Sequence, residues 1–160
     1  MSYYDLQKVS LLVVDDSGFM AKLLKTILRG LAAGTVHECT NSAEVLDCLR
    51  EYQPDAVFLD LEMPGMDGLS VATKIRKSED SPNPFLPIIM MTARASRARI
   101  AEAIKLGVHE ILAKPTSPKM LQDRLISILM HPRPMVQIGK YLVPEPRRTI
   151  AGPNEMTQVA

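Results

Sequence analysis

Polar side chains that could do chemistry stand at the ends of four short apolar runs. Asp15 and Asp16 follow the first run, Asp60 follows the third, and Thr92 and Lys114 stand after the last two. Each alone has an ordinary structural reading as a helix cap, a turn residue or a solvated surface lysine. Because the carboxyl ends of parallel strands meet at one edge of a sheet, we expect the five side chains to lie together.

The three carboxylates predict a metal site. Carboxylates within about 5 Å of one another repel by roughly 3 kcal/mol per pair at an effective dielectric near 20, and a divalent cation relieves that repulsion. An all-oxygen ligand set favours a hard ion, and Mg²⁺ suits a partly hydrated site beside a phosphoryl group. Lys114 would offer a positive charge to a phosphoryl oxygen, and Thr92 would offer a hydroxyl hydrogen bond. Asp60 is then the nucleophile that takes up the phosphoryl group as an acyl phosphate.

Hydrophobic periodicity predicts the elements that position these residues. Apolar runs predict five strands, at 9–14, 35–39, 55–59, 86–91 and 108–113. Apolar residues at spacings of three and four predict amphipathic helices at 17–31, 42–52, 68–77, 96–107 and 117–130. We expect Ser42 and Ser117 to be N-caps and Gly107 to end the fourth helix. Strict alternation of strand and helix predicts an α/β fold, a parallel sheet with helices on both faces.

Composition narrows the class of protein. The chain has 160 residues, of which 46% are hydrophobic and 23% charged, which fits one globular domain. Its formal net charge of +1 argues against a strongly basic nucleic-acid-binding surface. The apolar stretches are too short for a bilayer and the N-terminus is unlike a signal peptide, so we expect a cytoplasmic protein without membrane insertion. Cys39 and Cys48 lack a CxxC spacing and are expected to be reduced.

Four ordered motifs resemble the receiver domain of bacterial two-component response regulators: "VVDDS", "FLDLEMPGMDG", "IIMMTA" and "ILAKP". The resemblance covers about residues 8–130, and the opening "VVDDSGFMAKLL" is similar to stand-alone, chemotaxis-type regulators. It implies a flavodoxin-like, doubly wound, five-stranded parallel sheet with the strand order 2-1-3-4-5. It also implies that Asp60 accepts a phosphoryl group from a histidine kinase or phosphotransfer protein. The other implied site residues are the Mg²⁺ ligands Asp15, Asp16, Asp60 and the backbone carbonyl of Glu62, the phosphoryl-binding Lys114, and the switch hydroxyl of Thr92.

Three positions elaborate or break the family pattern. Ile111 stands three residues before the lysine, where the family usually has an aromatic residue. Since isoleucine is stiff at χ1, we predict that the signal travels instead through the loop after the fourth strand and the start of the next helix. Glu62 and Arg94 lie where the family tunes the lifetime of the phosphoryl group. We expect them either to pair across the mouth of the site or to remain solvated.

The resemblance also implies an output face for an unknown downstream protein. This face comprises the helix at 96–107, the strand at 108–113 and the helix at 117–130. Arg94, Arg97 and Arg99 at its start would suit an acidic partner, with a merely solvated basic face as the alternative.

The composition changes after residue 130, so we predict a receiver domain at 1–130 and a Pro/Arg-containing tail at 131–160 without an independent fold. The tail holds five of the twelve prolines and is too short for a DNA-binding domain, so no direct DNA binding is expected. Its apolar island at 135–143 is expected to pack on the receiver or to form a strand on a partner.

Two other functional classes stay open. One is a Mg²⁺-dependent aspartyl-phosphate phosphatase, although its usual DxD motif near the N-terminus is missing. The other is a nucleotide-binding fold, for which no glycine-rich loop follows the first strand. We favour a single-domain response regulator, a phosphorylation-controlled switch whose only chemistry is gaining and losing its own phosphoryl group.

Overall fold

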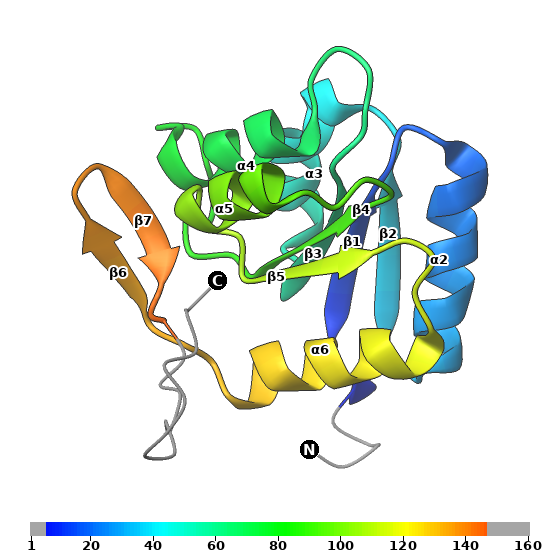
Figure 1. Cartoon of the computed structure of the whole chain (residues 1–160). Coiled ribbons are helices and arrows are strands. Elements are labelled where there is room, and N and C mark those ends of the chain that lie inside the picture. The colour runs from blue at the N-terminus through cyan, green and yellow to red at the C-terminus, as the bar shows by residue number, and fades with distance from the viewer. Residues whose placement is uncertain (1–5, 147–160) are drawn as a thin grey trace.

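A five-stranded parallel sheet forms the centre of the structure, in the order β2-β1-β3-β4-β5 (Figure 1). The computed structural model describes residues 6–146. The strands are β1 (Ser10–Val14), β2 (Thr35–Cys39), β3 (Ala56–Asp60), β4 (Ile88–Thr92) and β5 (Glu110–Ala113). The order confirms the predicted flavodoxin-like sheet. The strand order reverses between β1 and β3, because β2 lies on one side of this pair and β4 and β5 lie on the other. The carboxyl ends of β1 and β3 therefore border the crevice where such folds bind ligands.

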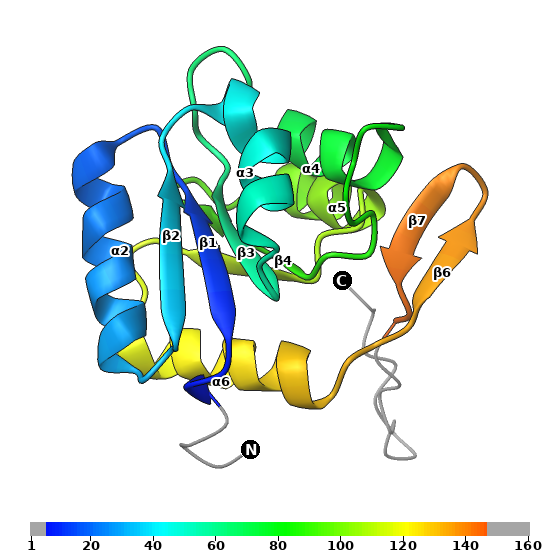
Figure 2. The ribbon, with the colours of Figure 1, turned by 180° about the vertical axis from the view of Figure 1, so that it is seen from behind.

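Helices cover both faces of this sheet, as the alternation of elements predicted (Figure 2). They are α2 (Gly18–Gly30), α3 (Val45–Tyr52) with the short 3₁₀ turn η1 (Ser42–Glu44) before it, α4 (Gly68–Lys77), α5 (Arg97–Lys105) and α6 (Pro118–Met130). Helices α3, α4 and α5 pack on one face, and α2 and α6 pack on the other. In the described part of the chain, we find no helix long and apolar enough to cross a membrane.

The central strands are apolar throughout because both of their faces are buried. In β1, Leu12 packs in the cluster under α3, α4 and α5, whereas Leu11 and Val13 pack in the cluster under α2 and α6. Strands β3 and β4 repeat this alternation and are buried at all of their positions. The two clusters hold the sheet rigid, so the side chains at the strand ends start from fixed backbone positions.

Most of the predicted helix ends are confirmed. The Ser117 hydroxyl accepts a hydrogen bond from Met120 N, and Gly107 follows α5 with a φ of +91°. The prediction for Ser42 was wrong: Asn41 precedes η1, and its side chain accepts the hydrogen bond from Ala43 N. Asparagine at this position bonds to the backbone two residues on, which places the cap one residue earlier.

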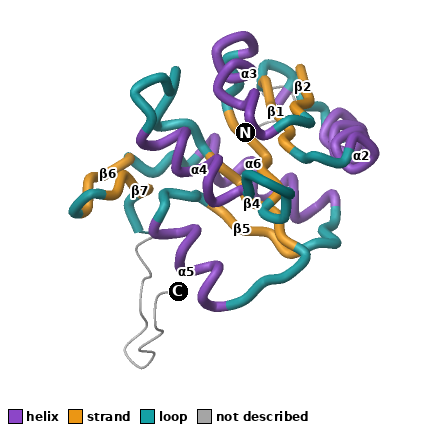
Figure 3. The backbone as a smooth tube through the Cα atoms, turned by 90° about the horizontal axis from the view of Figure 1, so that it is seen from above, coloured by secondary structure: helices purple, strands orange, loops and turns teal. Residues whose placement is uncertain are grey.

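A second, two-stranded sheet follows the receiver-like part of the chain. Strands β6 (Met135–Ile138) and β7 (Tyr141–Pro144) form an antiparallel hairpin beside α4 and α5 (Figure 3). Gly139 opens its two-residue loop with a φ of +59°, the position that glycine takes in type II′ hairpins. The apolar island of the tail therefore forms a hairpin that packs on the rest of the chain, and residues 147–160 lie outside the described residues.

Candidate functional site

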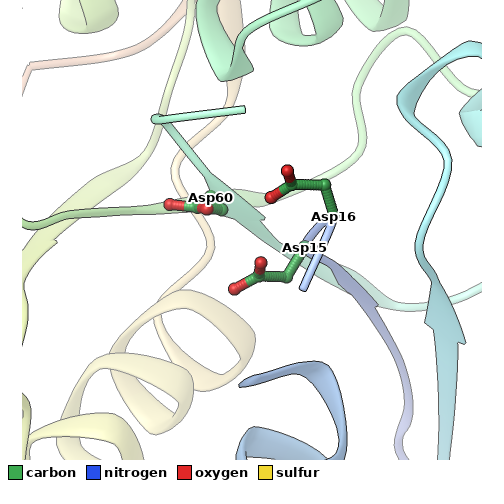
Figure 4. Close-up of side chains that lie close together, drawn as sticks. All are labelled: Asp15, Asp16 and Asp60. Carbon is green, nitrogen blue, oxygen red and sulfur yellow. The ribbon is translucent and has the colours of Figure 1, made fainter. Parts of the chain in front are cut away.

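Three carboxylates converge at the carboxyl edge of the sheet (Figure 4). Asp15 and Asp16 follow β1, Asp60 is the last residue of β3, and one oxygen of each lies within 4.8 Å of the others. Asp15 and Asp60 are each 7% exposed, whereas Asp16 is exposed. The sequence prediction that these residues meet is confirmed, because adjacent parallel strands β1 and β3 end side by side.

Backbone groups hold two of these carboxylates in place. Asp15 Oδ1 accepts a hydrogen bond from Ser17 N at 2.9 Å, and the Ser17 hydroxyl caps α2 by accepting from Met20 N. Asp60 Oδ1 accepts a longer bond from Glu62 N, at 3.4 Å. Ser17 is the N-cap of α2, so the ordinary structural reading of Asp16 as a helix cap does not hold. Asp16 is therefore left free of the cap and lies at the site.

Lys114 brings a positive charge into this site. Its Nζ lies 2.9 Å from Asp60 Oδ1 and 3.6 Å from Asp15 Oδ2. The residue is placed by the end of β5, where Lys114 N donates to the carbonyl of Thr92 at 2.7 Å, and a cis peptide bond joins it to Pro115. The same ammonium group therefore reaches both buried carboxylates from the end of β5, which β4 separates from β3.

The pKa values of Asp60 and Lys114 are both raised above their ordinary values. Burial raises the pKa of Asp60 above its ordinary value, and the Asp15 charge adds to this, although Lys114 and the Glu62 N–H partly offset it. Burial alone would lower the pKa of Lys114, but the hydrogen bond to Asp60 and the nearby carboxylates raise it. Lys114 therefore stays a cation and Asp60 stays close to a charge that can balance its own.

The predicted switch residue at the end of β4, Thr92, already donates a hydrogen bond within the protein. Thr92 is 1% exposed, and its hydroxyl donates to the Glu62 carboxylate. Ala93 N also donates to Glu62, at 3.3 Å, and Arg94 N donates to Thr92 Oγ1 at 3.0 Å. Burial acts to raise the pKa of Glu62, but these bonds outweigh it and lower the pKa. A threonine hydroxyl has one proton, so this bond uses the only donor that Thr92 could offer a phosphoryl group.

The expected pair between Glu62 and Arg94 is not formed. The ion pairs among residues 6–146 do not include it, and Glu62 instead binds Thr92 and the backbone that follows. The physical reason is proximity: the loop after β4 turns its own donors toward Glu62. Neither the pair nor full solvation, the two readings that the sequence left open, describes this carboxylate.

Two small features near Asp60 were not singled out from the sequence. Asp67 caps α4 by accepting from Ser70 N, and thereby leaves Asp60 free of a capping role. A Cβ on Gly68 would lie 2.5 Å from the backbone oxygen of Asp60, so only glycine lets α4 begin this close to β3. The signal was present in "MPGMDG", where Asp precedes Gly at a helix start, but the reason lies in the approach of the helix to the strand.

The donor set fits a hard divalent cation. Three carboxylate oxygens that lie within 4.8 Å of one another can share an ion that prefers oxygen ligands, and no histidine or cysteine belongs to the cluster. Asp15, Asp16 and Asp60 are the residues of this cluster that could hold Mg²⁺, and a further ligand from the backbone carbonyl of Glu62 stays a prediction of the family resemblance.

Comparison with known proteins identifies the family. Residues 11–126 match the model of the response regulator receiver domain, so this chain belongs to that family. It is 33% identical over 122 residues to chemotaxis protein CheY-3 of Vibrio cholerae, which covers 76% of this chain and 92% of that protein. It is 35% identical over 125 residues to the chemotaxis protein CheY homolog of Campylobacter jejuni, with the same coverage.

Solved structures agree with the fold. The structure of the Vibrio cholerae chemotaxis protein CheY4 is similar, with a TM-score of 0.68 and 26% sequence identity, over 76% of this chain and 98% of that one. Receiver domains are phosphoacceptor signalling switches, and the acidic cluster at Asp15, Asp16 and Asp60 is consistent with that chemistry. Family membership therefore favours the signalling interpretation over the phosphatase and the nucleotide-binding fold.

Proposed function

We propose that this protein is a single-domain response regulator that accepts a phosphoryl group on Asp60 from a histidine kinase or phosphotransfer protein. Phosphorylation then changes its affinity for a downstream protein. The observation that carries the proposal is the contact between Lys114 Nζ and Asp60 Oδ1 at 2.9 Å, inside a group of three carboxylates. A location in the cytoplasm stays a prediction.

The transfer is a displacement at phosphorus. A carboxylate oxygen of Asp60 attacks, a P–O bond forms, and the P–N bond of the donor phosphohistidine breaks, with its electron pair returning to the imidazole. The Lys114 ammonium group, already on Asp60, can move onto a phosphoryl oxygen and balance the added charge. Mg²⁺ on Asp15, Asp16, Asp60 and the Glu62 carbonyl would supply further charge neutralisation.

The switch would begin with the bond that Thr92 makes to Glu62. To bind a phosphoryl oxygen, the Thr92 hydroxyl must give up Glu62, because it has one proton to donate. Glu62 also holds Ala93 N, so its release frees the loop that leads into α5. The hydroxyl can donate to Glu62 or to a phosphoryl oxygen but not to both, so the loop has two arrangements. A ligand that binds one arrangement more tightly raises its population.

The output face would be α5, β5 and α6. Arg94 and Arg97 are exposed and Arg99 is partly buried; they lie just before and within the first turn of α5, after the Thr92 loop, and would suit an acidic partner. Ile111 in β5 lies opposite Met90 in β4 and packs against the buried cluster. An isoleucine in this position lacks the ring that the family usually moves, so the signal would pass through the loop and α5.

Phosphorylation of Asp60→Asn tests the proposal directly. With acetyl phosphate and Mg²⁺, the wild type should give a phosphorylated band on a phosphate-affinity gel, and Asp60→Asn should give none. Asp67→Asn is the matched control, because asparagine keeps the N-cap of α4 and the residue lies outside the cluster. Labelling of Asp60→Asn at the wild-type level would move the site elsewhere, and sustained turnover of phosphate esters would favour the phosphatase.

A further inference from the structure

The β6–β7 hairpin lies outside the family match, which ends at residue 126, yet it is fastened to the receiver. Arg133 donates to the backbone oxygens of His109 at 2.9 Å and Glu145 at 3.3 Å, and so joins the base of the hairpin to the start of β5. A Cβ on Gly107 would lie 2.4 Å from the backbone oxygen of Leu142. Strand β7 thus lies against the receiver with its backbone in close approach.

The hydrogen-bond register fixes which backbone groups point out of the hairpin. Opposed residues in an antiparallel ladder alternate between hydrogen-bonded and non-hydrogen-bonded pairs. Glu145 N donates to the oxygen of Pro134, which makes Pro134 and Glu145 a hydrogen-bonded pair. The register then makes Gln137 and Leu142 a non-bonded pair, as are Met135 and Pro144. On β7 these outward groups face the receiver, in agreement with the position of the Leu142 oxygen beside Gly107.

On β6 the same register points the backbone of Met135 and Gln137 away from β7. Within residues 6–146, no protein group bonds to these outward backbone groups, and β6 is the outer strand in both ribbon views (Figures 1 and 2). Unpaired edges are commonly protected by charge or proline, but Met135–Ile138 contains neither, and Ile138 is 55% exposed. Strand β6 is therefore open to pairing with another extended segment.

Charge around the hairpin indicates what kind of segment would fit. Three ammonium groups surround the Tyr141 ring, with Lys77, Lys105 and Lys140 at 4.6, 5.1 and 5.4 Å from its centroid. They come from α4, α5 and the hairpin loop, so the fold itself gathers three like charges at one place. A group of positive charges gathered around one ring gives this part of the surface a positive potential, which an acidic segment would complement.

A second copy of this chain would bring the same positive charges with it. Antiparallel pairing of two β6 strands needs the outward residues Met135 and Gln137 of one copy in register with those of the other, for example Met135 opposite Gln137 about Val136. Each copy would then add its own lysines and no acidic side chain from β6, whereas an acidic segment would supply the opposite charge. Charge thus favours a different, acidic chain over self-association.

We propose that β6 binds an extended acidic segment of a partner protein by strand addition. Main-chain bonds to Met135 and Gln137 would supply the pairing, and acidic side chains would meet Lys77, Lys105 and Lys140. This surface adjoins the amino end of β5, whereas Asp60 lies at the carboxyl edge of the sheet. The proposal does not depend on phosphorylation.

The test uses ten-residue fluorescent peptides of alternating Glu and Val, with Lys/Val and Gln/Val peptides as controls, on the full chain. Fluorescence anisotropy should show binding of the acidic peptide only, weakening as salt rises. Gln137→Pro removes an outward N–H and should weaken binding at least tenfold, whereas the matched Gln137→Thr keeps it and should bind as the wild type does. Lys140→Glu should also weaken binding, and Asp60→Asn should leave it unchanged.

Amide hydrogen exchange gives a readout that does not depend on a variant. The acidic peptide should slow the exchange of the Met135 and Gln137 amides in the wild type. Equal binding of the Lys/Val peptide, full binding by folded Gln137→Pro, or absence of binding would overturn the proposal. So would binding of a DNA oligonucleotide in place of the peptide, or dimerisation that Gln137→Pro abolishes. Slow exchange of the Gln137 amide without peptide that becomes fast on truncation after Pro146 would mean that this chain's own tail pairs with β6. That result would also overturn the proposal.

Discussion

The hydroxyl of Thr92 donates its single hydrogen bond to the carboxylate of Glu62, 30 residues earlier in the chain. The bond ties the loop after β4 to a residue two positions beyond Asp60, the last residue of β3. Since Thr92 is also the residue expected to contact a phosphoryl group, Glu62 competes with that group for one proton.

Removing the competitor should tighten binding of a phosphoryl mimic. We expect Glu62→Met, which has no oxygen to accept from Thr92, to bind beryllofluoride about fivefold more tightly, the equivalent of roughly 1 kcal/mol for one hydrogen bond. The gain should disappear in the Thr92→Val background, where no hydroxyl remains to be released. A double-mutant cycle by fluorescence or NMR titration separates this coupling from the general effect of removing a negative charge. An equal gain in both backgrounds would show that charge alone is responsible.

Mg²⁺ should stabilise the folded protein through the carboxylate cluster. An ion that binds the folded site and not the unfolded chain adds roughly 2.7 kcal/mol to the free energy of unfolding at about 100 times Kd. Thermal melts should therefore shift upward with Mg²⁺ in the wild type and much less in Asp16→Ala, whose side chain is exposed at the site. A wild-type melting temperature that does not change with Mg²⁺, or that rises by the same amount in Asp16→Ala, would contradict the predicted metal site.

Truncation after Met130 should leave a folded, phosphorylatable receiver. The residues of the two buried clusters all precede the tail, and the last of them is Ile128. Loss of the bond from Arg133 to His109 and of the hairpin packing should still lower the free energy of unfolding by roughly 1 to 3 kcal/mol. Urea unfolding measures that cost, and acetyl phosphate labelling checks the site. Aggregation, or loss of the cooperative transition, would show that the hairpin belongs to the core.

His109 should make the stability depend on pH. Its Nδ1 accepts from Ile88 N at 3.3 Å and lies 3.4 Å from Arg76 Nη2, so protonation there is opposed. Burial, with the charges of Arg76 and Arg133, lowers the pKa of His109 from 6.5 to about 3. Between these values the unfolded chain binds more protons, so this contribution to stability is lost as the pH falls from 6.5 toward 3.

The expected slope from His109 is at most about 1.4 kcal/mol per pH unit. His109→Asn keeps an acceptor but cannot be protonated, so the wild type should lose stability relative to this variant as the pH falls. Urea unfolding at pH 7, 6 and 5 gives the difference. A constant difference between the two proteins would mean that His109 is free to be protonated in the folded state.

The order of elements and the identity of the site residues could be predicted from the sequence. Both rest on local signals: apolar runs and helical spacings place the strands and helices, and the motifs put Asp15, Asp16, Asp60 and Lys114 at strand ends. Once the sheet is parallel, its geometry forces those ends to one edge. The carboxylate cluster thus follows from short-range pattern and a general rule of such folds.

Only the tertiary structure decided which partners the side chains take. Glu62 binds Thr92 and not Arg94, and the buried Arg76 donates to the backbone oxygens of Gly107 and Pro84. These partners are separated in the chain and become neighbours only when the elements pack. The docking of the hairpin is of the same kind, because Gly107 leaves room for Leu142 only in the folded chain. Periodicity reports which face of an element is buried, but hydrogen bonds depend on distances of a few ångströms that packing sets.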